Sequence, residues 1–163
     1  MARCLIIGCG CRGRALASGL LERGHTVRGT SRNASTRAEI ESAGAEAVAG
    51  DPDRISTLVP ALDHVSVACV LLGTATGSDE ELTALHGTRL EMLVERMLDT
   101  TVRGILYEAS GSVAAALLQA GAERVRAACE RSLIPNVMLD SAPSDHALWL
   151  RDALAGVEQL LNA

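Results

Sequence analysis

The 163-residue sequence contains no lysine and no phenylalanine, and it has only one tyrosine, Tyr107, and one tryptophan, Trp149. All of its fixed positive charges are therefore arginines, and its formal net charge is −5. Nucleic-acid binders usually combine a basic stripe with aromatic stacking residues, so this composition predicts no nucleic-acid partner. The absence of lysine also excludes a mechanism that depends on a catalytic lysine.

Long apolar runs and ordered cysteine patterns are missing as well. No stretch of about 18 apolar residues occurs, so we expect no membrane span. Residues 1–7 are too short an apolar segment for a signal peptide, and we expect a cytoplasmic protein. The five cysteines are odd in number and scattered, unlike a disulfide framework. Cys9 and Cys11 do not have the usual zinc spacing, and we expect no metal site.

The sequence does contain a regular alternation of strand and helix patterns. Short apolar runs predict strands at residues 4–7, 25–30, 45–48, 65–72, 103–107 and 136–139. Helical periodicity predicts helices at 14–23, 35–43, 53–62, 80–98, 112–131 and 146–161, with a possible break at Gly121. This alternation indicates a doubly wound parallel sheet between two helical layers, in the strand order 3-2-1-4-5-6. We expect residues 1–163 to form a single domain.

A glycine-rich segment, residues 8–13, follows the first predicted strand and opens the first predicted helix. Gly8 allows the tight turn, Gly10 lets a pyrophosphate approach the backbone, and Gly13 lets the helix pack on the sheet. The helix amides at Cys11 and Arg12 would face the phosphates. This pattern is typical of a Rossmann-type dinucleotide site. Ligands bind at the carboxyl edge of such sheets, so we add Leu72 and Gly73, where the fourth strand ends, to the cofactor-binding residues.

The end of the second strand indicates which dinucleotide binds. NAD-binding proteins usually place an acidic residue there, on the ribose 2′-hydroxyl. This chain has Arg32 instead, preceded by the hydroxyls of Thr30 and Ser31, with Arg12 and Arg37 as candidate helpers. A guanidinium can grip a 2′-phosphate with paired hydrogen bonds. We therefore predict NADP(H) rather than NAD(H).

Several motifs in order resemble the extended and atypical short-chain dehydrogenase/reductases, including the proteins grouped with NAD-dependent epimerases and dehydratases. The resemblance covers about residues 3–140 and rests on segments 7–16, 23–27, 49–52, 62–65, 86–88 and 104–110. It implies that Asp51 contacts the adenine and that the Gly104–Ser110 segment borders the substrate. It also predicts pairing of subunits through the helices that flank the fifth strand.

The chain departs from this family at the catalytic residues. The family's reaction uses a tyrosine with a lysine four residues later, and the sequence has no such pair. Ala109 and Gly111 replace two of the hydroxyl residues at the fifth strand, and only Ser110 remains, as a candidate substrate-binding residue. The usual substrate-binding lobe beyond the sixth strand is largely missing.

Three other polar residues are candidates for proton transfer, but each has an ordinary structural interpretation. Glu108 ends the fifth strand, where a raised pKa would suit an acid; a solvated or helix-capping carboxylate is the favoured interpretation. Tyr107 is expected to pack on the strand with one hydrogen bond. His86 is expected at the surface or at a subunit interface. The catalytic residues stay unassigned.

Three functions follow from these patterns. The leading hypothesis is an NADP(H)-binding protein related to atypical short-chain dehydrogenase/reductases, with unusual redox chemistry on a small molecule. The alternative is a non-catalytic NADP(H)-binding module that reports redox state to a partner. A third interpretation, the cofactor half of a 6-phosphogluconate- or β-hydroxyacid-type dehydrogenase, is disfavoured by Asp51 and the 86–88 segment. The apolar residues of segment 80–98 exceed one stripe, which favours a homodimer.

Overall fold

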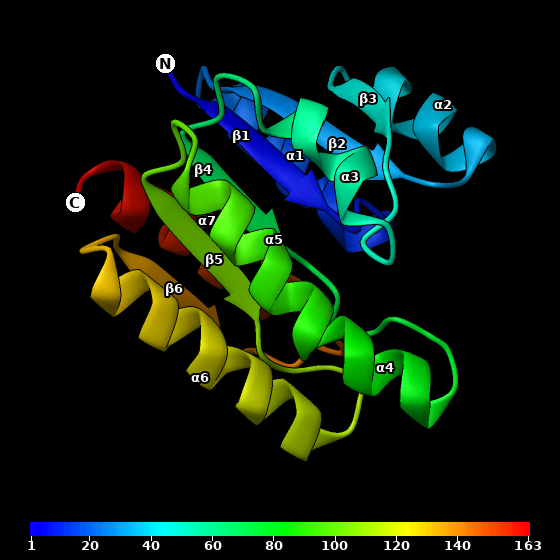
Figure 1. Cartoon of the computed structure of the whole chain (residues 1–163). Coiled ribbons are helices and arrows are strands. Elements are labelled where there is room, and N and C mark those ends of the chain that lie inside the picture. Colours follow the sequence, from blue (N-terminus) through cyan, green and yellow to red (C-terminus); the bar gives the residue numbers. More distant parts are fainter.

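The computed structural model describes all residues, 1–163, and contains one six-stranded sheet in the order β3-β2-β1-β4-β5-β6. The predicted strand order is confirmed, and every neighbouring pair is parallel. Figure 1 shows the twisted sheet between helices on both faces. The strands are β1 (Arg3–Ile7), β2 (Thr26–Ser31), β3 (Glu46–Ala49), β4 (Val67–Val70), β5 (Gly104–Glu108) and β6 (Asn136–Leu139).

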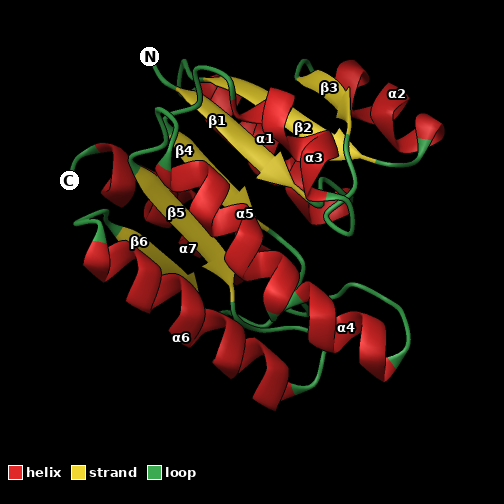
Figure 2. Cartoon of the chain, viewed as in Figure 1, coloured by secondary structure: helices red, strands yellow, loops and turns green.

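The helices divide between the two faces because the chain reverses direction across the sheet after β3 (Figures 1 and 2). One face carries α1 (Cys11–Glu22), α2 (Ala34–Ser42) and α7 (His146–Leu161), and α7 packs against α1. The other carries α3 (Ile55–Leu58), the 3₁₀ helix η1 (Val59–Leu62), α4 (Asp79–Leu85), α5 (Thr88–Leu98) and α6 (Ala115–Arg131). This is the predicted doubly wound, three-layer α/β fold. No helix is both long and apolar enough to cross a membrane.

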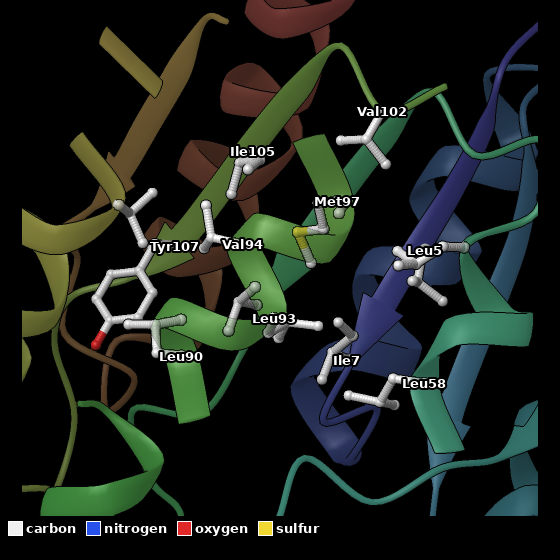
Figure 3. Packing of buried hydrophobic residues seen from close by; sticks show 14 of the residues in the cluster. Leu5, Ile7, Leu58, Leu90, Leu93, Val94, Met97, Val102, Ile105 and Tyr107 are labelled. Atoms are coloured by element: carbon white, nitrogen blue, oxygen red, sulfur yellow. The ribbon is translucent and has the colours of Figure 1, made fainter. Parts of the chain in front are cut away.

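The sheet separates two apolar cores. Alternate residues of each strand point to opposite faces, so Leu5 and Ile7 join the core under α5 and α6, whereas Cys4 and Ile6 join the core under α1 and α7. Figure 3 shows the side chains of α5 inserted against β1 and β5. The apolar residues of this helix that suggested a dimer, including Leu90, Leu93, Val94 and Met97, are buried within the chain itself. The observation behind that prediction is therefore explained without a second subunit.

The long helix predicted over residues 80–98 is wrong, because the structure contains two helices that meet at His86 and Gly87. Ser78 begins α4 with a capping box, and Gly87 begins α5. A Cβ at Gly87 would lie 2.5 Å from the carbonyl oxygen of Thr83, so only glycine fits this close backbone approach. The break turns the His86 side chain into the core.

Two smaller predictions are also corrected. The helix predicted at 53–62 is a short α-helix continued by the 3₁₀ turn at Pro60. Gly121 does not split α6, which runs unbroken from Ala115 to Arg131. Its role is steric, because a Cβ at Gly121 would lie 2.2 Å from the hydroxyl oxygen of Tyr107. The glycine therefore makes room for the single tyrosine of the chain.

Candidate functional site

A cleft of about 510 Å³ opens at the carboxyl ends of β1, β2 and β4. This is the point at which the strand order reverses, where doubly wound sheets bind their ligands. One end of the cleft lies at Arg32 and Asp53, its middle at the glycine-rich loop, and its other end at the loop after β4 and at Leu85. Its lining also includes Gly8, Cys9, Gly10, Thr30, Ser31, Thr36, Gly50, Pro52, Leu71, Leu72, Thr74, Ala75 and Thr76.

The glycine-rich loop has the geometry that each glycine was predicted to provide. Gly8 has a φ of 80°, and a Cβ there would lie 2.4 Å from the carbonyl oxygen of Leu71. A Cβ at Gly10 would meet no atom within 4 Å, so this backbone is open to a ligand. Gly13 is buried against Ile6 and Cys9. The helix start has no side-chain cap, which leaves its amides available to an anion.

Cys9 supports the loop from below. Its thiol lies beneath the loop, and Cβ atoms added at Gly13 and Gly29 would approach its sulfur to 3.3 and 2.8 Å. Burial raises the pKa of this thiol to about 11, so it is a packed, protonated side chain. Cys11, by contrast, is exposed at the first position of α1.

Arg12 was predicted to help hold the cofactor, but its guanidinium is directed to the interior. Its Nη2 atom donates to both carboxylate oxygens of Glu108, at 3.1 and 3.0 Å, and to the hydroxyl of Thr74 at 3.1 Å. The guanidinium also lies 5.3 Å from the ring centre of Trp149 on α7, a cation–π contact. The side chain is 22 % exposed, and Arg12 does not line the cleft.

The interpretation of Glu108 as a solvated or helix-capping residue is wrong, because its side chain is fully buried. Besides Arg12, the carboxylate accepts hydrogen bonds from the Gly73 amide and from the indole N–H of Trp149, each at 2.9 Å. Each oxygen therefore has two donors, one of which carries a charge. Both oxygens of this carboxylate are therefore occupied by donors of the protein itself, and neither is free to exchange a proton with a ligand.

His86 was expected at the surface but is 1 % exposed and bonded to Tyr107. Its Nε2 atom lies 3.0 Å from the carbonyl oxygen of Leu72, and its Nδ1 atom lies 2.6 Å from the Tyr107 hydroxyl. Because the carbonyl can only accept, the ring donates from Nε2 and accepts from the tyrosine at Nδ1. Burial lowers the pKa of His86 and raises that of Tyr107. The expected packed tyrosine with one hydrogen bond is confirmed.

The predicted adenosine end of the cleft brings Thr30, Ser31 and Arg32 together. The guanidinium of Arg32 is 65 % exposed and lies 3.8 Å from the carboxylates of both Asp51 and Asp53. Asp51 does not line the cleft itself, since its carboxylate accepts the amide of Asp53 in the turn after β3. Arg37 donates to the backbone carbonyl of Ser31 and so braces the end of β2.

At the other end, Leu72 lines the cleft while Gly73 is buried behind it. Ser110 does not line the cleft, because the turn that contains it packs tightly on Gly73. A Cβ added at Gly73 would lie 2.3 Å from the carbonyl oxygen of Ser110. Sequence reasoning did not identify Thr74, Thr76 and Leu85 as lining residues. The two threonines could have been predicted from the sequence as lining residues, because they follow the central strand directly in a glycine- and threonine-rich loop.

Comparison with known proteins agrees with this geometry. Residues 8–139 match the family model described as NAD(P)H-binding. No curated protein sequence matches the chain. Among solved structures, a triphenylmethane reductase of Citrobacter sp. complexed with NADP(H) superposes with a TM-score of 0.63 at 21 % identity, covering 85 % of this chain and 49 % of that one.

Two further structures show the same fold. A short-chain dehydrogenase/reductase superfamily protein of Agrobacterium tumefaciens with bound NAD gives a TM-score of 0.69 at 20 % identity, with 83 % of this chain and 48 % of that chain covered. UDP-glucose 4-epimerase of Thermotoga maritima gives a TM-score of 0.69 at 13 % identity, with 83 % of this chain and 54 % of that chain covered. The chain thus spans about half the length of these structures.

Proposed function

Because this chain belongs to the NAD(P)H-binding family, with the fold of short-chain dehydrogenase/reductases and epimerases, we propose that it binds NADP(H) in the cleft above β1 and exchanges hydride with a small molecule. The observation that carries this proposal is the continuity of the cleft. It runs from an arginine at the end of β2, past the open backbone of Gly10, to the loop after β4. A dinucleotide, with its diphosphate between two nucleosides, matches that order of groups.

The preference for NADP(H) is supported by the charges at the adenosine end. Arg32 is largely exposed and lies beyond hydrogen-bonding distance from its two aspartates, so it is free to turn to a 2′-phosphate. Asp53 is shared with Arg89, whose Nε lies 3.4 Å from its carboxylate. The two arginines balance Asp51 and Asp53, which lessens the repulsion of a phosphate. The fold does not favour either cofactor, since similar structures hold NADP(H) in one case and NAD in another.

Isothermal titration with NADPH and NADH tests this proposal. A charge-assisted contact is worth about 1.5–3 kcal/mol, so NADPH should bind at least about tenfold more tightly. Arg32→Ala should abolish that preference while leaving NADH affinity nearly unchanged. Arg54→Ala is the control, because Arg54 is exposed on the same side of the sheet without lining the cleft. Equal affinities in the wild type, or an unchanged preference in Arg32→Ala, would contradict the proposal.

The second candidate, a non-catalytic NADP(H)-binding module, is favoured by the chemistry of the β4 end of the cleft. That end is lined by aliphatic side chains and by the hydroxyls of Thr74 and Thr76. The titratable residues of the cleft lining are Arg32 and Asp53 at the far end and the buried thiol of Cys9. A partner protein that binds only one redox form of the loaded chain would support this alternative.

A further inference from the structure

The three consecutive residues Leu72, Gly73 and Thr74 are each held by a side chain from a different element, and two of these side chains, those of His86 and Glu108, are buried. His86, after α4, donates to the carbonyl of Leu72; Glu108, on β5, accepts the amide of Gly73; and Arg12, on α1, donates to the hydroxyl of Thr74. Surface loops seldom have every residue fixed by a non-local side chain. This loop is therefore fixed before any ligand binds.

The position of this loop indicates which part of a dinucleotide it would meet. Leu72 and Thr74 line the end of the cleft opposite Arg32, and the glycine-rich loop lies between the two ends. If the diphosphate rests on that loop and the adenosine lies towards Arg32, the nicotinamide half lies against Leu72 and Thr74. This step, and the inference that follows, rests on the proposed function.

The group that joins these parts is the ion pair of Arg12 and the buried Glu108, together with Trp149. Arg12 belongs to the glycine-rich loop, Glu108 ends β5, and Trp149 is a fully buried residue of α7. The carboxylate pairs with the guanidinium 3.0 Å away, and the same Nη2 atom donates to Thr74, so Glu108 fixes the direction of the Arg12 side chain. The two walls of the cleft are thereby linked to each other and to α7.

We propose that Glu108 and Trp149 are positioning residues for the nicotinamide half of the cofactor. They act through Arg12 and Gly73 on the loop after β4, and neither touches the ligand. Helix α7, which contributes nothing to the cleft lining, thus sets the geometry at its redox end. The adenosine half depends on other residues and is independent of this cluster.

The test compares whole and half cofactors in Glu108→Gln and Trp149→Phe. Leu160→Ala is the matched control, because Leu160 is a buried residue of α7 that packs on Gly104 at the opposite end of β5. For each protein, the affinities of NADPH and of 2′,5′-ADP are measured well below its unfolding temperature. Where the wild type prefers NADH, the probes are NADH and ADP. The fluorescence of the bound nicotinamide, excited directly, is recorded as a second signal.

The expected result is a loss of about tenfold in NADPH affinity for Glu108→Gln and a smaller loss for Trp149→Phe. The affinity of 2′,5′-ADP should stay within about twofold. Bound-nicotinamide fluorescence should change in both variants and not in the control. Should Glu108→Gln fail to fold, Trp149→Phe carries the comparison, because it removes a single neutral donor.

An unchanged ratio of NADPH to 2′,5′-ADP affinity in Trp149→Phe would overturn the inference while leaving the proposed function intact. Equal losses in Trp149→Phe and Leu160→Ala would overturn it as well, because they would indicate a general effect of stability. Wild-type protein that binds neither dinucleotide would overturn the proposed function and this inference together.

Discussion

At the scale of single residues, Gly10 separates the requirements of the fold from those of the ligand. Its φ of −82° and ψ of −154° are accessible to any residue, and a Cβ there would extend only into the cleft. We expect Gly10→Val to abolish dinucleotide binding, since the side chain would occupy the place of the diphosphate. The free energy of unfolding should change by no more than about 0.5 kcal/mol.

Titration calorimetry and urea unfolding of the same protein check both halves of this prediction. Gly8→Val is the contrasting variant, because Gly8 has a positive φ and its Cβ would collide with Leu71, so it should destabilise the fold. NADPH binding by Gly10→Val at the wild-type affinity would mean that the dinucleotide lies elsewhere.

His86 gives the molecule a predictable response to acid. Burial lowers its pKa below the usual value of 6.5, and the bond from Tyr107 occupies the nitrogen that would take the proton. The unfolded chain therefore binds a proton more readily than the folded chain. The stabilisation is complete above the unfolded pKa and is lost as the pH falls from about 7 towards the folded value, at up to about 1.4 kcal/mol per pH unit.

Urea unfolding at several pH values, in the wild type and in His86→Gln, isolates this contribution. The glutamine can still donate to the Leu72 carbonyl but does not titrate. The stability advantage of the wild type should therefore shrink between pH 7 and pH 5. A constant difference between the two proteins across that range would show that His86 is not the responsible group.

At the scale of elements, the end of α6 contains an avoidable strain. Leu133, just after the helix, has a φ of 55° and a side chain that is 92 % exposed. Left-handed backbone costs a residue with a Cβ about 1–2 kcal/mol, and glycine is the usual choice at this position. We expect Leu133→Gly to raise the free energy of unfolding by about 0.5–1 kcal/mol.

Urea unfolding measures this change, and Leu133→Ala distinguishes its cause. The alanine variant removes the exposed apolar side chain but keeps the Cβ, so its stability should stay close to that of the wild type. An equal gain in both variants would attribute the effect to the leucine side chain instead of the backbone.

The elements themselves were largely predictable from sequence. Residues 136–139 and 146–161 were predicted to the residue, and the other strands to within three positions. The strand order followed from the alternation of strand and helix patterns, which is typical of a doubly wound sheet. The interruption at Gly87 was missed because a periodic apolar pattern continues through it, and the bond between His86 and Tyr107 that accompanies the break joins residues 21 positions apart.

The site was predictable where it depends on local backbone and not where it depends on distant partners. Gly8, Gly10 and Gly13 act through their own geometry, and a motif of this kind is visible in sequence. Glu108 was misjudged because a glutamate is almost never fully buried unless it is paired. Its partner Arg12 lies 96 residues away, and no periodicity in the sequence connects the two.

At the scale of the whole molecule, the chemistry of the cleft restricts which acceptors could be reduced under the proposed function. Reduction of a ketone needs an acid within hydrogen-bonding reach of the oxygen, and such a group typically contributes 10²–10⁴ in rate. The β4 end of the cleft has only threonine hydroxyls, and Glu108 is fully engaged. Hydride transfer to a quinone or flavin produces an anion that water can protonate. The rate of this reaction therefore depends less on a positioned acid than the rate of ketone reduction does.

We therefore expect NADPH oxidation to be faster with quinones or flavins than with ketones. With ketones, kcat should fall well below the enzyme median of about 10 s⁻¹. The decay of NADPH absorbance measures both rates, and Gly10→Val provides the background. Ketone reduction near the median rate would contradict this expectation and would mean that a group from outside this cleft lining, such as one from a partner subunit, supplies the proton.

The cluster that links α7 to the glycine-rich loop also has a consequence for the order of events during synthesis. The loop leaves the ribosome early, but Glu108 follows Arg12 by 96 residues and Trp149 follows Glu108 by another 41. At 5–20 residues per second, this interval lasts roughly 7–30 s. Until Glu108 is made, Arg12 lacks this counter-charge, and until α7 is made, β5 lacks the helix that carries Trp149. The nascent chain thus presents its glycine-rich loop long before the cluster can form. If the cluster positions the cofactor as proposed, capture of a dinucleotide is a step of maturation that begins only after translation has passed Trp149.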